Sequence, residues 1–185
     1  MVPSCERTLP GVLIETERLL LRPLVMSDLD EFVALHEDPE VVRFVRALDS
    51  EQAARRLRAN EQEWAERGHG MLAVIEQAEG RLLGRVGLKH WPQFGETEAG
   101  WLLRRDAWGR GYATEAARAC LGWGFATLSV AYITAMIAPG NTRSIRIAQR
   151  LGFKPTRQDV LLGDPVIVHA VERKDVSSLA PSRAD

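Results

Sequence analysis

Short apolar runs bounded by turn residues predict seven strands in this chain. They lie at residues 17–25, 71–76, 81–90, 96–104, 132–137, 153–156 and 166–171. Glycine and proline mark turns between them, as at residues 78–80 and 139–140. The runs are short and separated, as expected for strands of one sheet rather than for long helices.

Apolar residues recur at helical spacing in the segments between these strands. They predict helices after Ser27, over residues 40–46, 50–67, about 113–127 and 141–151. Acids follow Ser27 in the first turn, and Gly68 and Gly152 stand just past two of the helix ends. The helix at 113–127 has a side of small and apolar residues that would let it pack close to a sheet: Ala116, Ala117, Cys120, Leu121 and Gly124.

The order of these elements predicts a mixed α/β domain built on one sheet. A chain of 185 residues is long enough for one domain that hides about 70% of its unfolded surface. We expect a folded domain over residues 13–173, a flexible lead-in at 1–12 and a flexible tail at 174–185. Neither internal repeats nor low-complexity segments are visible.

Composition narrows the classes of function. Hydrophobic residues make up 45% and charged residues 26% of the chain, and the net charge is −1. Nothing here favours nucleic acid, and no apolar run approaches the roughly 18 residues of a membrane span. The first ten residues do not resemble a signal peptide. Cys5 and Cys120 do not suggest a disulfide framework, so we expect a cytoplasmic protein with Cys120 in its core. His36, His69 and His169 lack metal-ligand spacing.

Residues 108–116 carry the most informative motif. Gly109 and Gly111 stand between a strand and a helix, where bare amides and the helix dipole suit a phosphate. A Walker A loop is excluded because Tyr112 and Ala113 replace its lysine and hydroxyl residue. Thr114 and the late position of the turn disfavour a dinucleotide fingerprint. On this motif alone, a tight turn without a ligand remains open.

A second motif follows about 30 residues later, at 141–144 and 151–155. With it, the chain resembles the GNAT superfamily of acyl-CoA-dependent N-acetyltransferases, most closely the branch typified by RimJ and RimL. The matching pieces lie at residues 16–22, 38–41, 84–88, 98–103, 108–116, 141–144 and 151–153. The resemblance implies the GNAT fold: a central, twisted, mostly antiparallel sheet of about six or seven strands, splayed at the cofactor site and flanked by helices.

The resemblance also implies a binding site for acetyl-CoA. In the family, backbone amides of the turn hold the pyrophosphate and a strand edge pairs with the pantetheine arm. Asn141 serves equally well as a helix N-cap, and Arg143 lies on a basic stripe that could meet phosphates. Trp108 departs from the Gln or Arg of the family pattern, which matters little for a backbone grip. The cofactor-binding candidates are Leu102, Leu103, Trp108, Gly109, Arg110, Gly111, Tyr112, Ala113, Thr114, Asn141 and Arg143.

Glu98 and Ser144 are the catalytic candidates. Strand alternation puts Glu96 and Glu98 on one face unless a bulge intervenes, and Glu98 could act as a base or lie on a solvated edge. By resemblance, Ser144 would donate a proton or a hydrogen bond to the departing CoA sulfur. Otherwise it is a first-turn serine that bonds locally. His90 is a second base candidate or a surface histidine, and Trp91 walls the acceptor site or packs.

The expected function is acetyl transfer from acetyl-CoA to a primary amine by direct attack in a ternary complex. The acceptor is a protein N-terminus or a small-molecule amine. An α-amine with a pKa of about 8 needs little help from a base, whereas a lysine amine at about 10.4 needs a strong one. The alternative is a catalytically silent acyl-CoA-binding module. We expect no metal, nucleic acid or membrane partner, and the family commonly forms homodimers.

Overall fold

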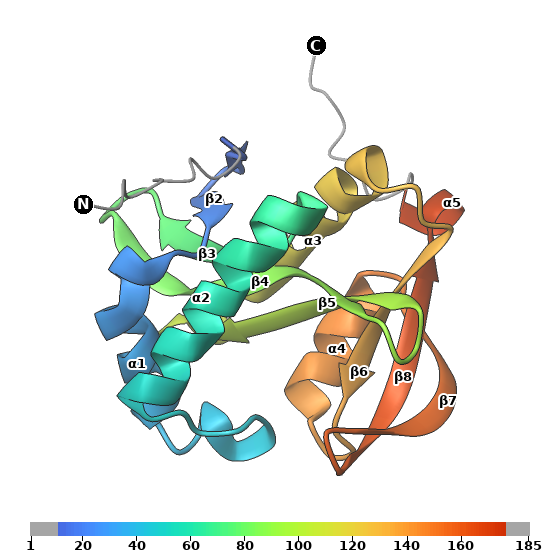
Figure 1. Ribbon diagram of the computed structural model, residues 1–185. Coiled ribbons are helices and arrows are strands. Elements are labelled where there is room, and N and C mark those ends of the chain that lie inside the picture. Colours follow the sequence, from blue (N-terminus) through green and yellow to red (C-terminus); the bar gives the residue numbers. More distant parts are fainter. Residues whose placement is uncertain (1–10, 177–185) are drawn as a thin grey trace, which may run out of the picture.

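An eight-stranded, mostly antiparallel sheet forms the centre of the computed structural model, which describes residues 11–176 (Figure 1). The strand order is β1-β2-β3-β4-β5-β6-β8-β7, and only β5 and β6 run parallel. The strands are β1 (Ile14–Glu15), β2 (Leu19–Pro23), β3 (Met71–Glu76), β4 (Arg81–Trp91), β5 (Glu96–Leu103), β6 (Tyr132–Ile137), β7 (Lys154–Leu161) and β8 (Asp164–Glu172).

Helices cover both faces of the sheet. In Figure 1, α1 (Leu29–Glu37) and α2 (Ser50–Arg67) lie in front of the sheet and α3 (Tyr112–Thr127) lies behind it. α4 (Thr142–Arg150) packs with α3 on the same apolar cluster, and the short α5 (Arg173–Val176) follows β8. No helix in the described part of the chain is long and apolar enough to cross a membrane.

The predicted fold class is confirmed, although two features of the sheet differ. The sheet has eight strands, because β1 adds an edge strand. With only two residues (Ile14–Glu15), β1 is too short to be predicted from a run of apolar residues. The last hairpin is also longer than the predicted runs at 153–156 and 166–171. β7 is almost wholly exposed and polar because it is an edge strand that pairs only with β8. Its sequence therefore lacks the alternation that marks a half-buried strand.

Two predicted helical segments also differ in detail. Residues 40–46 contain a single 3₁₀ turn, Val42–Phe44, rather than a helix. Ser27 does not cap α1, since it lies inside another 3₁₀ turn where the carboxylate of Asp28 accepts from Val25 N at 3.0 Å. Most of the expected lead-in and tail lies outside the described residues, and residues 174–176 form the end of α5.

The limits of α2 follow its sequence closely. Asp49 Oδ1 accepts a hydrogen bond from Gln52 N at 2.8 Å, and the Gln52 side chain accepts from Asp49 N at 3.1 Å. This reciprocal capping box fixes the start at Ser50. Gly68 ends the helix in the left-handed region, with φ of 69°. The predicted range of residues 50–67 is therefore confirmed.

α3 packs against β4 at the distance that its small residues permit. A Cβ added to Gly124 would lie 2.4 Å from Cδ1 of Leu88, a side chain with no exposed surface. Cys120 and Leu121 are buried on the same side of the helix, as the sequence predicted. At the other end of the helix, Tyr112 of the first turn belongs to the same apolar cluster as Leu103 at the end of β5.

Two glycines of α3 provide a matched test of this packing. Gly122 is exposed, with nothing within 4 Å of an added Cβ. We expect Gly122→Ala to raise the free energy of unfolding by about 0.5–1 kcal/mol through helix propensity. Gly124→Ala should lower it by about 1–3 kcal/mol through overpacking against Leu88. Urea denaturation measures both values, and equal gains at the two positions would contradict the close approach.

Candidate active site

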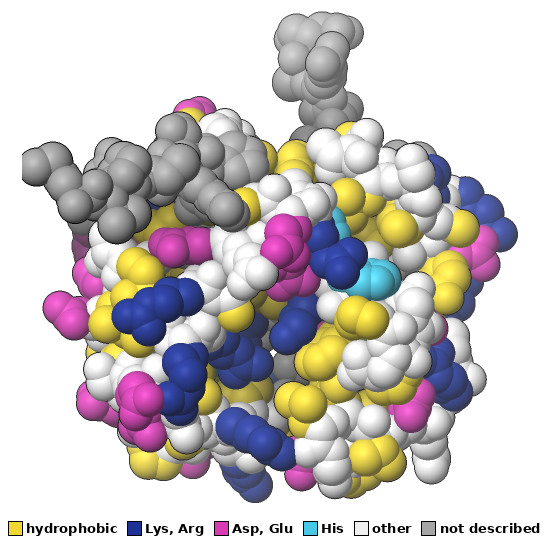
Figure 2. Space-filling view, viewed as in Figure 1, with side chains coloured by type: hydrophobic (Ala, Val, Ile, Leu, Met, Phe, Trp, Pro, Cys, Tyr) yellow, Lys and Arg dark blue, Asp and Glu magenta, His cyan; other side chains and the backbone are white. Residues whose placement is uncertain are grey.

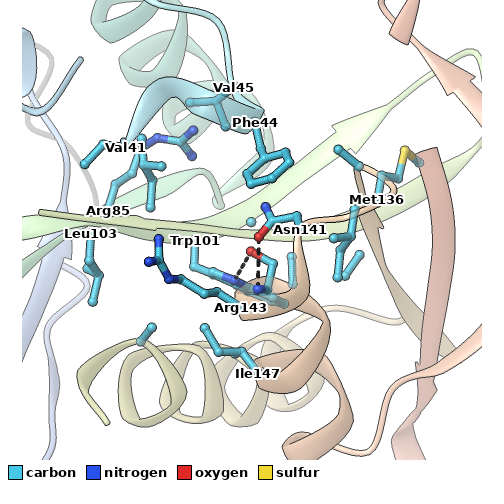
Figure 3. A pocket seen from close by; sticks show the side chains of 18 of the residues that line it. Val41, Phe44, Val45, Arg85, Trp101, Leu103, Met136, Asn141, Arg143 and Ile147 are labelled. Atoms are coloured by element: carbon cyan, nitrogen blue, oxygen red, sulfur yellow. Dashed lines mark hydrogen bonds between the residues drawn. The ribbon is translucent and has the colours of Figure 1, made fainter. Parts of the chain in front are cut away.

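A cleft of about 840 Å³ opens where β5 and β6 separate. The two parallel strands pair at one position, Glu98 with Thr134. Beyond this pair, residues 99–103 of β5 and 135–138 on the side of β6 line opposite walls of the cleft. The first turns of α3 and α4 and the segment 40–46 also line it (Figure 3).

Strand β5 presents different residues to the two sides of the sheet. Its register with β4 runs without a shift from Leu103 to Glu96, so alternation holds over the whole strand. Glu96 and Glu98 therefore share one face, as the alternation predicted. This is the face covered by α1 and α2, where Leu102 packs. Trp101 and Leu103 project from the other face toward the cluster that contains α3 and α4.

The glycine turn before α3 has the conformation of an anion cradle. Gly109 and Gly111 have φ of 75° and 85°, left-handed values that glycine adopts without strain. Gly111 is the N-cap of α3, so the amides of the following first turn lack intrahelical acceptors. Tyr112, Ala113 and Thr114 line the cleft together with both glycines.

A network behind the turn holds it in place. The carboxylate of Glu115 accepts from Thr16 Oγ1 at 2.6 Å, from Arg18 N at 3.0 Å and from Arg18 Nε at 2.7 Å. Arg18 Nη1 donates to the carbonyl of Arg110 at 3.0 Å, and its guanidinium lies 4.4 Å from the centre of the Tyr112 ring. The segment before β2 thus braces the turn from the side away from the cleft.

The start of α4 forms the opposite wall. Asn141 Oδ1 accepts from Ser144 N at 3.2 Å, which confirms the predicted N-cap (Figure 3). Trp101 Nε1 donates to Ser144 Oγ at 3.3 Å. The serine oxygen is thereby used as an acceptor, and its own proton is left to donate. Arg143 stacks on Trp108 with its guanidinium 4.1 Å from the ring centre.

Glu98 lies at the point where the strands divide. Its Oε2 accepts from Trp91 Nε1 at 2.5 Å and its Oε1 from Met136 N at 3.3 Å. Burial raises the pKa of Glu98 and outweighs these hydrogen bonds and the charges of Arg85 and Lys89, which lower it. A carboxylate with a raised pKa is a better proton acceptor than an exposed one.

Glu96, two residues before Glu98 on the same face of β5, has a different environment. It is buried and receives two hydrogen bonds from Arg157 of β7, each 2.9 Å long. These bonds raise the pKa of Arg157. This bidentate pair fastens the last hairpin to β5, which leaves Glu98 as the strand's carboxylate in the cleft.

The cleft brings together most of the residues singled out in the sequence: Trp91, Glu98, Leu102, Leu103, Trp108, Gly109, Gly111, Tyr112, Ala113, Thr114, Asn141, Arg143 and Ser144. Arg110 does not line it, because its guanidinium lies over the Tyr112 ring at 4.8 Å and near Glu76 Oε1 at 3.4 Å. His90 does not line it either. It pairs with Thr97 in the register, on the face opposite to Glu98.

Several lining residues had no assigned role in the sequence. They include Arg56 of α2, Arg85 and Lys89 of β4, and the segment 40–46. Arg85 falls within the matched piece at 84–88, which could have drawn attention to it. The strand pattern alone does not tell which face of β4 meets the cleft.

Other reactive side chains lie away from this geometry. Cys120 is buried in the core as predicted, and burial raises the pKa of its thiol to about 12. Burial also lowers the pKa of His36 to about 4. Within residues 11–176, no group of three or more His, Cys, Asp or Glu side chains is arranged to hold a metal.

Comparison with known proteins gives consistent matches. A family model described as an acetyltransferase (GNAT) domain matches residues 18–154. YkkB of Bacillus subtilis (strain 168) is 34% identical over 166 residues, which cover 86% of this chain and 94% of YkkB. N-acetyltransferase p20 of Bacillus licheniformis is 30% identical over 143 residues, 75% of this chain and 80% of p20. The acetyltransferase structure from Agrobacterium tumefaciens str. C58 is 30% identical, with a TM-score of 0.79 and coverage of 88% and 95%.

More distant structures share the fold alone. RimL, a ribosomal L7/L12 α-N-protein acetyltransferase solved in complex with coenzyme A, is 16% identical with a TM-score of 0.74. The match covers 87% of this chain and 98% of RimL. RimL and this chain therefore share the fold.

The brace behind the glycine turn should give stability a pH dependence. Hydrogen bonds from Thr16 and Arg18 outweigh partial burial and lower the pKa of Glu115 below its ordinary 4.5. Its contribution is thus present above about pH 4.5 and is lost as the pH falls through the lower folded-state pKa. We expect Glu115→Gln to cost about 1–3 kcal/mol of unfolding free energy at neutral pH, and less in acid.

Urea denaturation between about pH 3 and about pH 7, which spans the titration of the carboxyl group, measures this difference. Glu51→Gln is the control, because its ion pair with Arg55 is exposed and worth about 0–1 kcal/mol. A cost for Glu115→Gln that stays constant over the pH range would contradict the brace.

Proposed function

Because the chain belongs to the GNAT acetyltransferase family, we propose that it transfers the acetyl group of acetyl-CoA to a primary amine. The acceptor is a protein N-terminus or a small molecule, and the amine attacks directly within a ternary complex. The observation that carries this proposal is the single β5–β6 pair, beyond which the strands open toward the N-terminus of α3. Cytoplasmic location and homodimer formation stay predictions.

The residues at the cleft fit acetyl-CoA. Left-handed Gly109 and Gly111, with the free amides of the first turn of α3, suit a pyrophosphate. The separated edges of β5 and β6 offer backbone groups that need hydrogen-bond partners, which the amides of a pantetheine arm can supply. Bound there, acetyl-CoA would supply an activated acetyl group. The coenzyme A in the RimL structure supports this assignment through the shared fold.

Glu98 is the proposed base or steering group for the acceptor amine. The hydrogen bonds from Trp91 and Met136 fix its carboxylate at the opening of the cleft. Its raised pKa reduces the difference from the pKa of an α-amine, so that the carboxylate can take a proton from the amine directly or through one water. Trp91 is then a wall of the acceptor site and also a positioning residue for the base.

Ser144 is the proposed donor to the departing sulfur. Its oxygen accepts from Trp101, and its backbone amide is fixed by Asn141. Both contacts orient the remaining hydroxyl proton. A thiol has a pKa of about 8.5, so the leaving thiolate needs only modest stabilisation. Ser144 should therefore matter less than Glu98.

Calorimetry with acetyl-CoA tests the cradle. We expect the purified protein to bind acetyl-CoA and Gly111→Trp to abolish that binding, because a side chain there strains the left-handed backbone and its Cβ would meet Arg18 Nη2 at 3.4 Å, which displaces the turn. Gly122→Trp is the matched control on the exposed side of the same helix, where nothing lies within 4 Å of a Cβ. Unchanged affinity of Gly111→Trp would place the cofactor elsewhere.

Thiol release across a panel of amines separates the two classes of function. Amine-dependent release supports the transferase. Acetyl-CoA affinity without release from any amine would instead favour the silent acyl-CoA-binding module.

Substitutions of Glu98 and Ser144 test their roles. We expect Glu98→Gln to lower turnover by about 10²–10⁴-fold while acetyl-CoA affinity is kept. Since burial raises the pKa of Glu98, wild-type activity should be lost as the pH falls through a value above the ordinary 4.5. The Glu98→Gln variant should lack that limb. Ser144→Ala should cause a smaller loss, and a double variant with full activity would remove both residues from the mechanism.

A further inference from the structure

Three basic side chains line the cleft on the α2 side. Arg85 and Lys89 belong to β4, and Arg56 belongs to α2. The register pairs Lys89 directly with Glu98 and Arg85 with Leu102, so these β4 side chains share the face of Glu98. Lys89 Nζ also lies 4.2 Å from the ring centre of Trp91, the residue that donates to Glu98.

The guanidinium of Arg85 reaches back toward Glu98. A Cβ added at Gly100 would lie 3.9 Å from Arg85 Nη1, which places the guanidinium over this glycine. Gly100 is two residues from Glu98 on the same face, roughly 7 Å along the strand. Figure 3 shows Arg85 on the side of Val41 and Phe44, and Arg143 on the other side of the strand. One small molecule can therefore span the base and this guanidinium.

These cations exceed the negative charge around them. No ion pair joins Arg56, Arg85 or Lys89 to a carboxylate within 4.0 Å among residues 11–176, and Arg85 Nε is buried without a hydrogen-bond partner. By contrast, Arg22 pairs with Asp28 at 2.6 Å. Figure 2 shows Lys and Arg side chains gathered around the hollow of this face.

This excess of positive charge favours the binding of an anion from outside the chain. Burial and the charge of Arg56 lower the pKa of Arg85 to about 10, so the guanidinium is still charged at neutral pH. Among the described residues, the charge of Glu98 acts on all three cations, and that of Glu63 acts on Lys89 alone. A partly buried, uncompensated charge is costly to hold, whereas a guanidinium fork binds a carboxylate or phosphate well.

A contact across the mouth limits the size of the occupant. Arg46, at the end of the segment 40–46, donates from Nη2 to the carbonyl of Leu162 at 2.6 Å and lies 3.9 Å from Asp164. Leu162 and Asp164 form the tip of the β7–β8 hairpin, which lines the same cleft. The bridge encloses the acceptor side, which suits a small molecule better than an extended polypeptide.

We propose that the acceptor is a small primary amine bearing an anionic group, a carboxylate or a phosphate, held by Arg56, Arg85 and Lys89 while Glu98 faces the amine. This inference rests on the proposed function and names its substrate class. The second anion is distinct from the pyrophosphate expected at α3. That cradle lies beside Arg143, on the opposite side of β5 from Arg85.

Matched acceptors test the proposal. Thiol release from acetyl-CoA is measured with α-amino acids, their carboxamides, aminoalkyl phosphonates and short peptides with free N-termini. Rates are compared per neutral amine, because amidation lowers the amine pKa. We expect kcat/KM about 100-fold higher for anionic amines than for their neutral partners, since a site built for a charged group rejects analogues that lack it. The carboxylate and phosphonate arms identify which anion is bound.

Substitutions of the basic side chains, with one control, locate the effect. Arg85→Met and Lys89→Met should raise KM for the anionic acceptor by about 10–100-fold, far more than KM for neutral amines, and leave KM for acetyl-CoA unchanged. Arg85→Lys should recover part of the loss, because it keeps the charge without the fork. Arg58→Met, on the same helix as Arg56 but outside the cleft, should have no effect. Thermal denaturation verifies that each variant is folded.

The outcomes separate this inference from the proposed function. Transfer to neutral amines or peptide N-termini at rates equal to or above those of anionic amines would overturn the inference, whereas the proposed acetyltransferase activity would stand. Unchanged acceptor KM in the folded Arg85→Met and Lys89→Met variants would also overturn it. If acetyl-CoA binds and no amine is acetylated, the proposed function fails and the acceptor assignment fails with it.

Discussion

The site depends on one backbone pairing, that of Glu98 with Thr134. Two parallel strands that continued to pair would satisfy each other's amides and carbonyls and leave no cleft. Here pairing stops after one position, while β5 is held on its other edge by β4 and β6 by β8. Trp101 contributes to the separation, since it packs edge-on against Phe153 and donates to Ser144. The opening is therefore a fixed part of the sheet rather than a loose end.

Alternation along β5 then divides the chemistry between two faces. Glu98 and Gly100 point to the side of α2, where the basic side chains of β4 gather. Trp101 points to the side of α3 and α4, where the glycine turn and Ser144 lie. A single strand thus sets the position of the acceptor groups relative to the cofactor cradle, with no loop between them to vary the distance.

Sequence reasoning succeeded where local chemistry decides the structure. The range of α2 and its end at Gly68 are as predicted, and Asn141 caps α4 as predicted. It predicted β7 too short, at residues 153–156, because the polar and exposed residues of the rest of the strand carry no periodic pattern. In the site, adjacency along the chain suggested Arg110 and His90, but Glu76 draws Arg110 away and strand alternation turns His90 to the other face. Arg56, Arg85 and Lys89 meet only through the register of β4 and β5 and the packing of α2, which local patterns do not encode.

The bridge from Arg46 to the β7–β8 hairpin affects how molecules enter and leave the cleft. Its ion pair is largely exposed, with 65% and 71% of the two side chains accessible, and such pairs contribute about 0–1 kcal/mol. The segment that carries Arg46 contains one 3₁₀ turn and no longer helix. Together with the hydrogen bond from Arg46 to Leu162, a contact of about 1–3 kcal/mol would favour the closed mouth by roughly 5–150-fold. We therefore expect the bridge to restrict the mouth while it is formed and to open without unfolding of the sheet, so that molecules can enter and leave.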